Sequence, residues 1–427
     1  MTTDLSTRRA RLLGATAPLF YEEPVHIVCG EGAWLFDDTG KRYVDMYNNV
    51  PCVGHCHPHV VEAMHRQAST LNVHSRYLHE GVLDYAERLT NLHGDHLSSV
   101  VITCTGTEAN EVALGMARAV TGGQGIICTD STYHGNSAEV SKLNRIKQLP
   151  NGPAPDIRAI PFPEHYRPLD DTASSAELAD LYLAEVQKAI DSFAESGIPF
   201  AGMIVCSILA NEGLPTIPKG FMPRAAELVR NAGGVFIADE VQAGFCRTGQ
   251  WWGYDVVGVK PDIVSLGKPM GNGLPIAGVV ASEEMLNTYR EQKLYFNTFA
   301  ASPLQAAVGM AVIDVIEDEN LAQNVSDLGS YLQAELCTFQ EWCEPIGDVR
   351  GHGLFLGIEW VSDRESKTPD PVGSNAVVNQ LKEKGFLMGS AGAFRNTIKI
   401  RPPLVFSREQ ADLFLTAFEE VVRGASS

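Results

Sequence analysis

The stretch Ser-Leu-Gly-Lys-Pro-Met-Gly-Asn-Gly at residues 265–273 decides how the rest of the chain is interpreted. It follows residues 261–264 (Pro-Asp-Ile-Val), a short, largely apolar run typical of a buried strand. Lys268 therefore lies just past a strand end, in a turn rich in glycine and proline. Most lysines near turns are solvated, but a partly desolvated lysine loses its proton more easily and can form a Schiff base with a carbonyl.

A second stretch, Gly-Gly-Val-Phe-Ile-Ala-Asp-Glu-Val-Gln at residues 233–242, strengthens that interpretation. Its apolar strand ends on the carboxylate pair Asp239 and Glu240, at the same kind of strand edge as Lys268. A lysine that forms an imine, with an aspartate one strand away, suits pyridoxal phosphate (PLP). The aspartate would keep the pyridine nitrogen protonated, so that the ring acts as an electron sink.

Composition limits the classes of partner. The chain has 427 residues, 44% of them hydrophobic, which predicts two to three structural units with a sizeable core and no membrane span. A net charge of −19 argues against nucleic acid and against anionic membranes as partners. Residues 1–11 carry no apolar signal segment, and nine scattered cysteines are typical of free thiols in a reducing compartment. These features predict a soluble cytoplasmic protein.

Helices and strands alternate along most of the chain, which predicts an α/β fold with a mostly parallel sheet covered on both faces. In such a sheet the ligand lies at the carboxyl ends of the strands. We expect a segment at 1–60, beginning with an antiparallel meander at 23–44, that packs with a small domain; a large domain at 61–310; and a small α+β domain at 311–427. The proline-rich range 147–171 predicts a long loop. The expected strands are 99–104, 125–130, 202–207, 235–239, 263–266, 354–360 and 397–400, and the expected helices are 60–71, 85–92, 108–120, 176–195, 222–232, 302–318, 374–384 and 407–422.

Two further turns are candidates for ligand contacts. Residues 103–110 (Thr-Cys-Thr-Gly-Thr-Glu-Ala-Asn) form a strand, a turn of small residues and a helix start, with Thr107 as the expected N-cap. Free N–H groups and the helix dipole would make this turn a phosphate cradle, although an ordinary capped helix has the same pattern. Tyr133 follows the next strand and could stack on a flat ring or pack in the core.

Two cysteines and three histidines between residues 52 and 59 suggest a metal site, but their spacing argues against one. A second ligand pair at a suitable distance is absent from the sequence, and Pro58 is expected to open a helix. We therefore predict a polar loop here and no bound metal.

Taken together, the motifs resemble those of the class III PLP-dependent aminotransferases of fold type I over nearly the whole chain. That resemblance implies a large domain with a mostly parallel sheet and a smaller α+β domain. Within the family the chain is most similar to the branch that holds alanine–glyoxylate-type aminotransferases and ethanolamine-phosphate phospholyases. The motifs that carry the family resemblance are 54–58, 105–110, 133–135, 239–244, 247–249, 268–273 and 297–299, and those that carry the branch are 75–79, 267–273, 295–298 and 399–403.

The resemblance implies a role for each cofactor residue. Lys268 would hold PLP as an internal aldimine and shuttle the proton, and Asp239 would pair with the pyridinium nitrogen. Tyr133 would stack on the ring beside His134, and Gln242 would approach the ring hydroxyl. The phosphate would be bound by Gly106 and Thr107, with Thr298 of the neighbouring subunit completing the site, which implies a homodimer.

The substrate side departs from the family. Many members carry an arginine, which grips the α-carboxylate, where this chain has Lys399; a lysine lacks the bidentate fork, so the grip could move to Arg401 or Arg76. Many members also carry a Glu-Pro pair at residues 207–208, where this chain reads Ser-Ile, which leaves Glu212 as the acid. Tyr77, in the loop of Arg76, completes the set of candidate substrate residues.

Transamination is the main functional hypothesis: an amine or amino acid passes its amino group through the Lys268 aldimine and pyridoxamine phosphate to a keto acid such as pyruvate. The first alternative is a phospholyase that eliminates phosphate from a phosphorylated amino alcohol, using the same lysine as base. A second alternative, a PLP-fold protein that only binds a ligand, is disfavoured by the intact Lys268 and Asp239.

Overall fold

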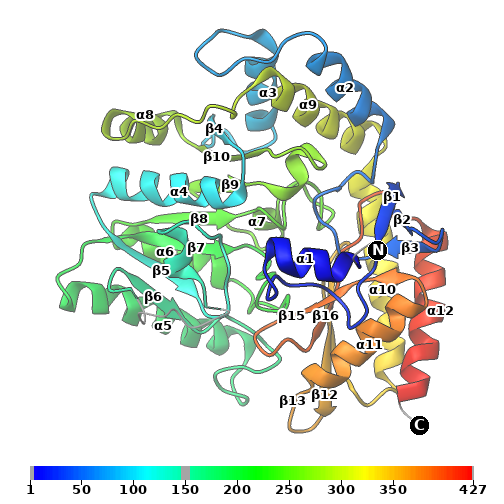
Figure 1. Cartoon of the computed structure of the whole chain (residues 1–427). Coiled ribbons are helices and arrows are strands. Elements are labelled where there is room, and N and C mark those ends of the chain that lie inside the picture. Colours follow the sequence, from blue (N-terminus) through cyan, green and yellow to red (C-terminus); the bar gives the residue numbers. More distant parts are fainter. Residues whose placement is uncertain (1–3, 146–153, 426–427) are drawn as a thin grey trace.

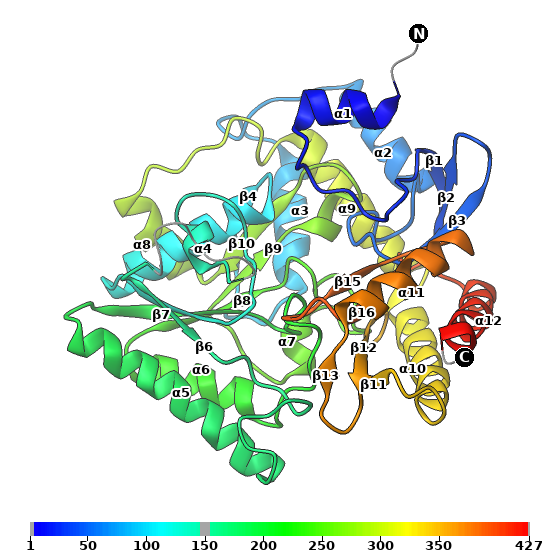
Figure 2. The ribbon, with the colours of Figure 1, turned by 60° about the horizontal axis from the view of Figure 1, so that its bottom comes forward.

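The computed structural model describes residues 4–145 and 154–425. A large domain is built on a seven-stranded sheet, and a small domain packs beside it (Figure 1). Figure 2 shows the helices α5 (Ser175–Glu195) and α6 (Phe221–Asn231) along one face of the large sheet, with α4 (Gly106–Thr121) and α8 (Glu283–Gln292) on the other.

The large sheet has the strand order β4-β10-β9-β8-β7-β5-β6. Every neighbouring pair is parallel except those of β10, which runs antiparallel to both β4 and β9. The prediction of a mostly parallel sheet is therefore confirmed. The strands are β4 Ser99–Thr103, β5 Gly125–Thr129, β6 Ile157–Ile160, β7 Phe200–Cys206, β8 Val235–Asp239, β9 Ile263–Leu266 and β10 Ala277–Ala281.

The strands of the large sheet are apolar because both faces are covered. Along β8, Phe236 and Ala238 belong to the core beneath α5 and α6, whereas Val235 and Ile237 belong to the core beneath α4. This alternation is the period of two that a strand imposes on its side chains. Both cores contain leucine, isoleucine, valine and phenylalanine or tyrosine side chains that are almost fully buried.

The N-terminal strands β1 (Ile27–Glu31), β2 (Trp34–Asp37) and β3 (Arg42–Asp45) form an antiparallel meander, as predicted. Strand β3 also pairs in parallel with β14 (Phe386–Leu387) of the small domain. The helix α1 (Leu5–Leu13) has no buried residue and lies at the edge of the molecule in Figure 2.

The small domain carries the sheet β11-β12-β16-β15, with β13 beside β12. The helix α9 packs on α2 and α3 and also contacts α10. The strands of the small domain are β11 Ile346–His352, β12 Phe355–Asp363, β13 Thr368–Pro369, β15 Gly389–Ala391 and β16 Thr397–Ile400. The α-helices of the chain not yet given are α2 Pro58–Ala68, α3 Glu80–Asn91, α7 Gly253–Val256, α9 Pro303–Asp318, α10 Leu321–Gln340, α11 Pro371–Glu383 and α12 Arg408–Ala425.

Two predictions of local structure are wrong. The expected long loop at 147–171 contains β6, which extends the sheet beside β5; part of that range, residues 146–153, lies outside the described residues. The helix N-cap is Thr105, whose side chain accepts a hydrogen bond from the N–H of Glu108, and Thr107 lies inside α4. A cap needs an extended backbone, and Thr105 has it (φ −144°, ψ 151°).

No helix in the described part of the chain is both long and apolar enough to cross a bilayer.

Candidate active site

Asp239 is the last residue of β8, and its carboxylate is held by three donors. Oδ2 accepts hydrogen bonds from His134 Nδ1 (2.6 Å) and Asn110 Nδ2 (2.9 Å), and Oδ1 accepts from the Val241 N–H (3.0 Å). Burial by itself would raise the pKa of Asp239, but the contacts with His134, Val241 and Asn110 outweigh it and hold the pKa below its usual value. The residue, with 5% of its surface exposed, therefore presents an ionised carboxylate at the carboxyl end of the sheet.

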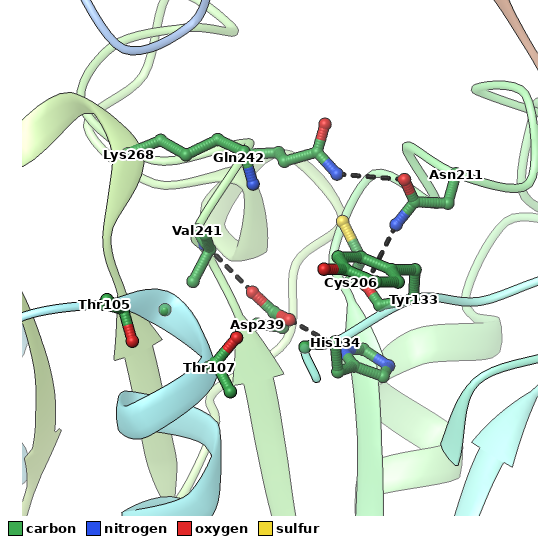
Figure 3. A pocket seen from close by; sticks show the side chains of 12 residues that line it. Thr105, Thr107, Tyr133, His134, Cys206, Asn211, Asp239, Val241, Gln242 and Lys268 are labelled. Carbon is green, nitrogen blue, oxygen red and sulfur yellow. Dashed lines mark hydrogen bonds and ion pairs between the residues drawn. The ribbon is translucent and has the colours of Figure 1, made fainter. Parts of the chain in front are cut away.

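Lys268 begins a short 3-10 turn (η2, Lys268–Gly271) two residues after β9. Because β8 and β9 are parallel, their carboxyl ends meet at one edge, which brings Lys268 to the side of Asp239. Burial lowers the pKa of Lys268, and the nearby Arg401 lowers it further, while Asp239 opposes both effects. Figure 3 shows the lysine side chain crossing the cavity above Val241 and Asp239.

The first turn of α4 borders the same cavity. Gly106 is in contact with Val241 so closely that an added Cβ would lie 2.8 Å from Val241 Cγ1. On the other side, a Cβ at Gly135 would lie 2.6 Å from Thr107 Oγ1, and the φ of +146° at Gly135 favours glycine as well. The backbone is thus packed tightly around the N-terminus of a sixteen-residue helix, where N–H groups and the dipole favour an anion.

These residues enclose a cavity of about 140 Å³ (Figure 3). It is lined by residues that were expected to bind the cofactor, namely Gly106, Thr107, Tyr133, His134, Asp239, Gln242 and Lys268. Thr298, predicted to act in the neighbouring subunit, is exposed and lies outside the lining of its own cavity. The residues that sequence reasoning missed are Thr105, Gly135, Cys206, Asn211 and Val241.

The cavity fits PLP on the chemistry of its groups. An ionised carboxylate suits a pyridine nitrogen that must stay protonated, a lysine of lowered pKa suits an aldehyde, and a tightly packed helix N-terminus suits a phosphate. Lys268 would hold the cofactor, Asp239 would face its ring nitrogen, and Gly106 with Thr107 would receive its phosphate. Fold and cavity together define a PLP-dependent enzyme of fold type I.

Comparison with known proteins agrees. The family model "Aminotransferase class-III" matches residues 20–422, and the chain belongs to this family. It is 39% identical to "Alanine--glyoxylate aminotransferase 2-like" from Drosophila melanogaster, over 98% of this chain and 86% of the relative, and 37% identical to "Alanine--glyoxylate aminotransferase 2 homolog 2, mitochondrial" from Arabidopsis thaliana, over 97% and 86%. A solved phospholyase from Arthrobacter in complex with phosphoethanolamine is 38% identical and superposes with a TM-score of 0.95, over 98% of this chain and 99% of that one.

The protein is a PLP-dependent aminotransferase that acts on small molecules. When bound, PLP supplies an aldehyde that condenses with amines and a ring that accepts electrons from the carbon next to the nitrogen. Lys268, with its lowered pKa, would be the general base and acid that removes the proton from that carbon and returns it. Asp239 would present its negative charge to the ring nitrogen, and His134 and Asn110 hold its carboxylate in place.

A second, larger cavity of about 650 Å³ adjoins the first, and Asn211 lines both. Three cations, Arg145, Arg395 and Lys399, line it, and none of its described lining residues is acidic. Lys399 is 4% exposed, and its ammonium lies 5.6 Å from the centroid of the Phe355 ring but forms no hydrogen bond or ion pair with another described residue. Burial, with Arg401 nearby, lowers its pKa well below the usual value.

The other predicted substrate residues are scattered. Arg76 and Tyr77 lie exposed on a loop, with the Arg76 guanidinium 3.9 Å from the Phe296 ring centroid, and both are outside the lining of the two cavities of this chain. Glu212 is buried behind the cavities, where Thr129 Oγ1 donates to it (2.7 Å), and burial raises its pKa.

Arg401 is buried and its guanidinium is engaged: it donates to the Tyr47 carbonyl (2.9 Å) and to Gln242 Oε1. Arg145 and Arg395, which do line the larger cavity, were not predicted from the sequence, because neither belongs to one of the motifs.

The histidines of the 52–59 loop each pair with a different carboxylate. His55 meets Asp45 (2.8 Å), His57 meets Glu319 (2.9 Å) and His59 meets Asp314 (3.4 Å). Among the described residues, no group of three or more His, Cys, Asp or Glu side chains is arranged to hold a metal ion.

Proposed function

We propose that this aminotransferase takes an amine donor that carries an anionic group distant from its nitrogen, and passes the amino group to a keto acid such as pyruvate. The observation that carries the proposal is the unpaired, buried Lys399 in the larger cavity, beside the cavity of Lys268. A buried cation without a counter-charge is costly, so a bound anion would offset that cost.

The cations that line the larger cavity are not arranged like a site for an α-carboxylate. A lysine is a compact point charge, whereas an α-carboxylate is best held by the planar fork of an arginine. Arg401, a buried arginine near Lys399, already donates to Tyr47 and Gln242. A phosphate-like group with several acceptor oxygens suits Lys399 together with Arg395 and Arg145.

A half-reaction on the purified holoenzyme tests the proposal. Each amine donor is added alone, and the visible absorbance of the bound cofactor is followed while free phosphate is assayed. Loss of the absorbance band, its return on adding pyruvate and the absence of phosphate release would support transamination. The panel contains phosphoethanolamine, ethanolamine, alanine and an uncharged alkyl amine. A preference for uncharged amines would refute the anion-binding role of the cavity.

A second candidate is phosphate elimination from a phosphorylated amino alcohol. It is favoured by the cationic lining of the larger cavity and by the 38% identity to a phospholyase whose solved complex contains phosphoethanolamine. Lys268 would again remove the proton, but the electrons would expel phosphate. Release of one phosphate per donor, with the absorbance band retained and no need for a keto acid, would identify this reaction.

We propose further that the enzyme is a homodimer in which Thr298 completes the neighbouring cofactor site. Large apolar side chains close to Thr298 in the chain are exposed in the single chain: Leu294 is 100% exposed and Phe299 77%. Burial of such a patch against a second copy would remove it from water.

A mixed dimer separates the two contributions. Lys268→Ala subunits are inactive, and Thr298→Ala subunits should bind PLP weakly. In the mixed dimer, one site combines the intact Lys268 with the partner's intact threonine. Activity above that of both homodimers would support the exchange of Thr298, and activity no greater than that of the Thr298→Ala homodimer would refute it.

We propose a cytoplasmic location on the basis of cysteine chemistry. All nine cysteines are free thiols in the structure, which suits a reducing compartment. Cell fractionation with an antibody against the protein tests this, and recovery in an organelle fraction would contradict it.

A further inference from the structure

Asn211 lines both cavities: the smaller one around Lys268, called here the cofactor cavity, and the larger one lined by Arg145, Arg395 and Lys399, called here the cationic cavity. Its side chain makes two hydrogen bonds. Oδ1 accepts from Gln242 Nε2 (3.1 Å), and Nδ2 donates to the carbonyl of Tyr133 (3.1 Å). Figure 3 shows the two amides facing each other above Tyr133.

The orientation of this chain of amides is determined at both ends. Arg401 can only donate, so Gln242 must present its oxygen to Arg401 and its NH₂ group to Asn211. The Tyr133 carbonyl can only accept, so Asn211 must present its NH₂ group there and its oxygen to Gln242. The four groups form one directed hydrogen-bond chain, in which Asn211 links Gln242 to the Tyr133 carbonyl.

The backbone of Asn211 is hydrogen-bonded to the wall of the cationic cavity. Its carbonyl accepts a hydrogen bond from the N–H of Gly392 (3.2 Å), which belongs to the segment 390–395 that forms one wall of the cationic cavity. Two residues on, the carbonyl of Gly213 accepts from Arg350 Nε (3.0 Å), whose guanidinium also pairs with Glu359 (2.6 Å). Asn211 therefore belongs to a loop held by the small domain, while its side chain reaches the cofactor cavity.

We propose that Asn211 is a positioning residue that couples the cationic cavity to the cofactor. It holds Gln242 and the Tyr133 loop in place, and a change at the 390–395 wall on anion binding is transmitted through its backbone to these two contacts. The inference rests on the proposed function, since it requires PLP in the smaller cavity and an anion in the larger one.

The test uses the PLP-loaded enzyme and inorganic phosphate as the probe. Phosphate binding is measured by calorimetry, and the visible absorbance spectrum of the cofactor is recorded in the same titration. In the wild type we expect the absorbance spectrum to change, with its midpoint at the same phosphate concentration as the midpoint of the heat signal. In Asn211→Ala we expect phosphate to bind within roughly threefold of the wild type, but without the spectral change. A spectral change of full size in Asn211→Ala would overturn the proposal, and so would a wild type that binds phosphate without any spectral change.

A second measurement, in phosphate-free buffer, separates this inference from the anion proposal. Asn211→Ala should shift the absorbance maximum of bound PLP and raise the PLP dissociation constant roughly tenfold, because two hydrogen bonds are lost. If the wild-type enzyme gives no heat with phosphate, the anion-binding proposal and the coupling both fail. The positioning role is then decided by the absorbance maximum and the PLP dissociation constant alone. An unchanged maximum and dissociation constant would overturn it.

The isosteric variant Asn211→Asp guards against a general loss of folding. It keeps an acceptor for Gln242 but places an oxygen against the Tyr133 carbonyl. We expect PLP to bind more weakly while the absorbance maximum stays near that of the wild type. Asn287→Ala, an exposed change on α8, is the matched control and should leave both readouts unchanged. An absorbance shift in Asn211→Asp as large as that in Asn211→Ala would contradict the positioning of Gln242 by Asn211, because the aspartate keeps that contact.

Discussion

Replacing Asp239 by asparagine tests the electrostatics of the site with almost no change of shape. The carboxylate accepts from three donors, two at Oδ2 (His134 and Asn110) and one at Oδ1 (the Val241 N–H). An asparagine has one oxygen for these two positions. In the orientation that keeps His134 and Asn110 satisfied, its NH₂ group faces the Val241 N–H at about the present 3.0 Å.

The magnitude follows from that geometry. One buried donor without an acceptor costs about 1–3 kcal/mol, which would lower the melting temperature of the cofactor-free protein. The loss of the negative charge that would face the ring nitrogen acts mainly on the reaction rate, not on stability. Removal of one preorganised electrostatic contact typically lowers kcat by about 10²–10³-fold, and Asp239→Ala, which also removes the contacts to His134 and Asn110, should cost still more.

The assay measures kcat, the PLP dissociation constant and the exchange of the donor's Cα proton with deuterated water. We expect proton exchange and kcat to fall together, because both depend on the stabilisation of the same carbanion. Asp412→Asn, a change in an exposed ion pair with Arg408, is the control and should leave all three values unchanged. Near-wild-type kcat and proton exchange in PLP-loaded Asp239→Asn would refute the role assigned to the charge.

Three other changes test separate parts of the site. Gly106→Ala would place a Cβ 2.8 Å from Val241 Cγ1, so we expect overpacking of about 1–3 kcal/mol, weaker PLP binding measured by equilibrium dialysis, and recovery in the double variant with Val241→Ala. Lys399→Met should lower kcat/KM for phosphorylated amines by about 10²-fold and leave that for uncharged amines unchanged; an equal loss for both would contradict a role in anion binding. Burial raises the pKa of Glu164 to about 7 from 4.5, so the folded state binds the extra proton and loses stability as pH rises between these values. Calorimetric melting temperatures should therefore fall less from about pH 5 to pH 7 in Glu164→Gln than in the wild type, and identical pH dependence would show that Glu164 does not titrate there.

The two residues with the clearest chemistry were predictable from local patterns. Lys268 and Asp239 each follow an apolar run that forms a strand, and parallel strands bring their carboxyl ends together. The capping residue of α4 was misplaced by two positions, because Thr105 and Thr107 are the same residue type and only the backbone angles distinguish them. Strand β6 was missed because its four residues lie among prolines, and it is stabilised by pairing with β5 rather than by its own sequence.

The sequence by itself determined the alternation of helices and strands, the turn that carries Lys268 and the charge of Asp239, because these depend on residues that are neighbours in the chain. Only the tertiary structure decided the composition of the substrate side. Arg145, Asn211 and Lys399 come from three distant segments and meet around one cavity. Whether a cation is paired or free depends on what the fold places beside it. Arg401 is engaged by Gln242 and Tyr47, whereas the ammonium of Lys399, two residues earlier in β16, is not. That difference is set by burial and long-range contacts, which no local pattern encodes.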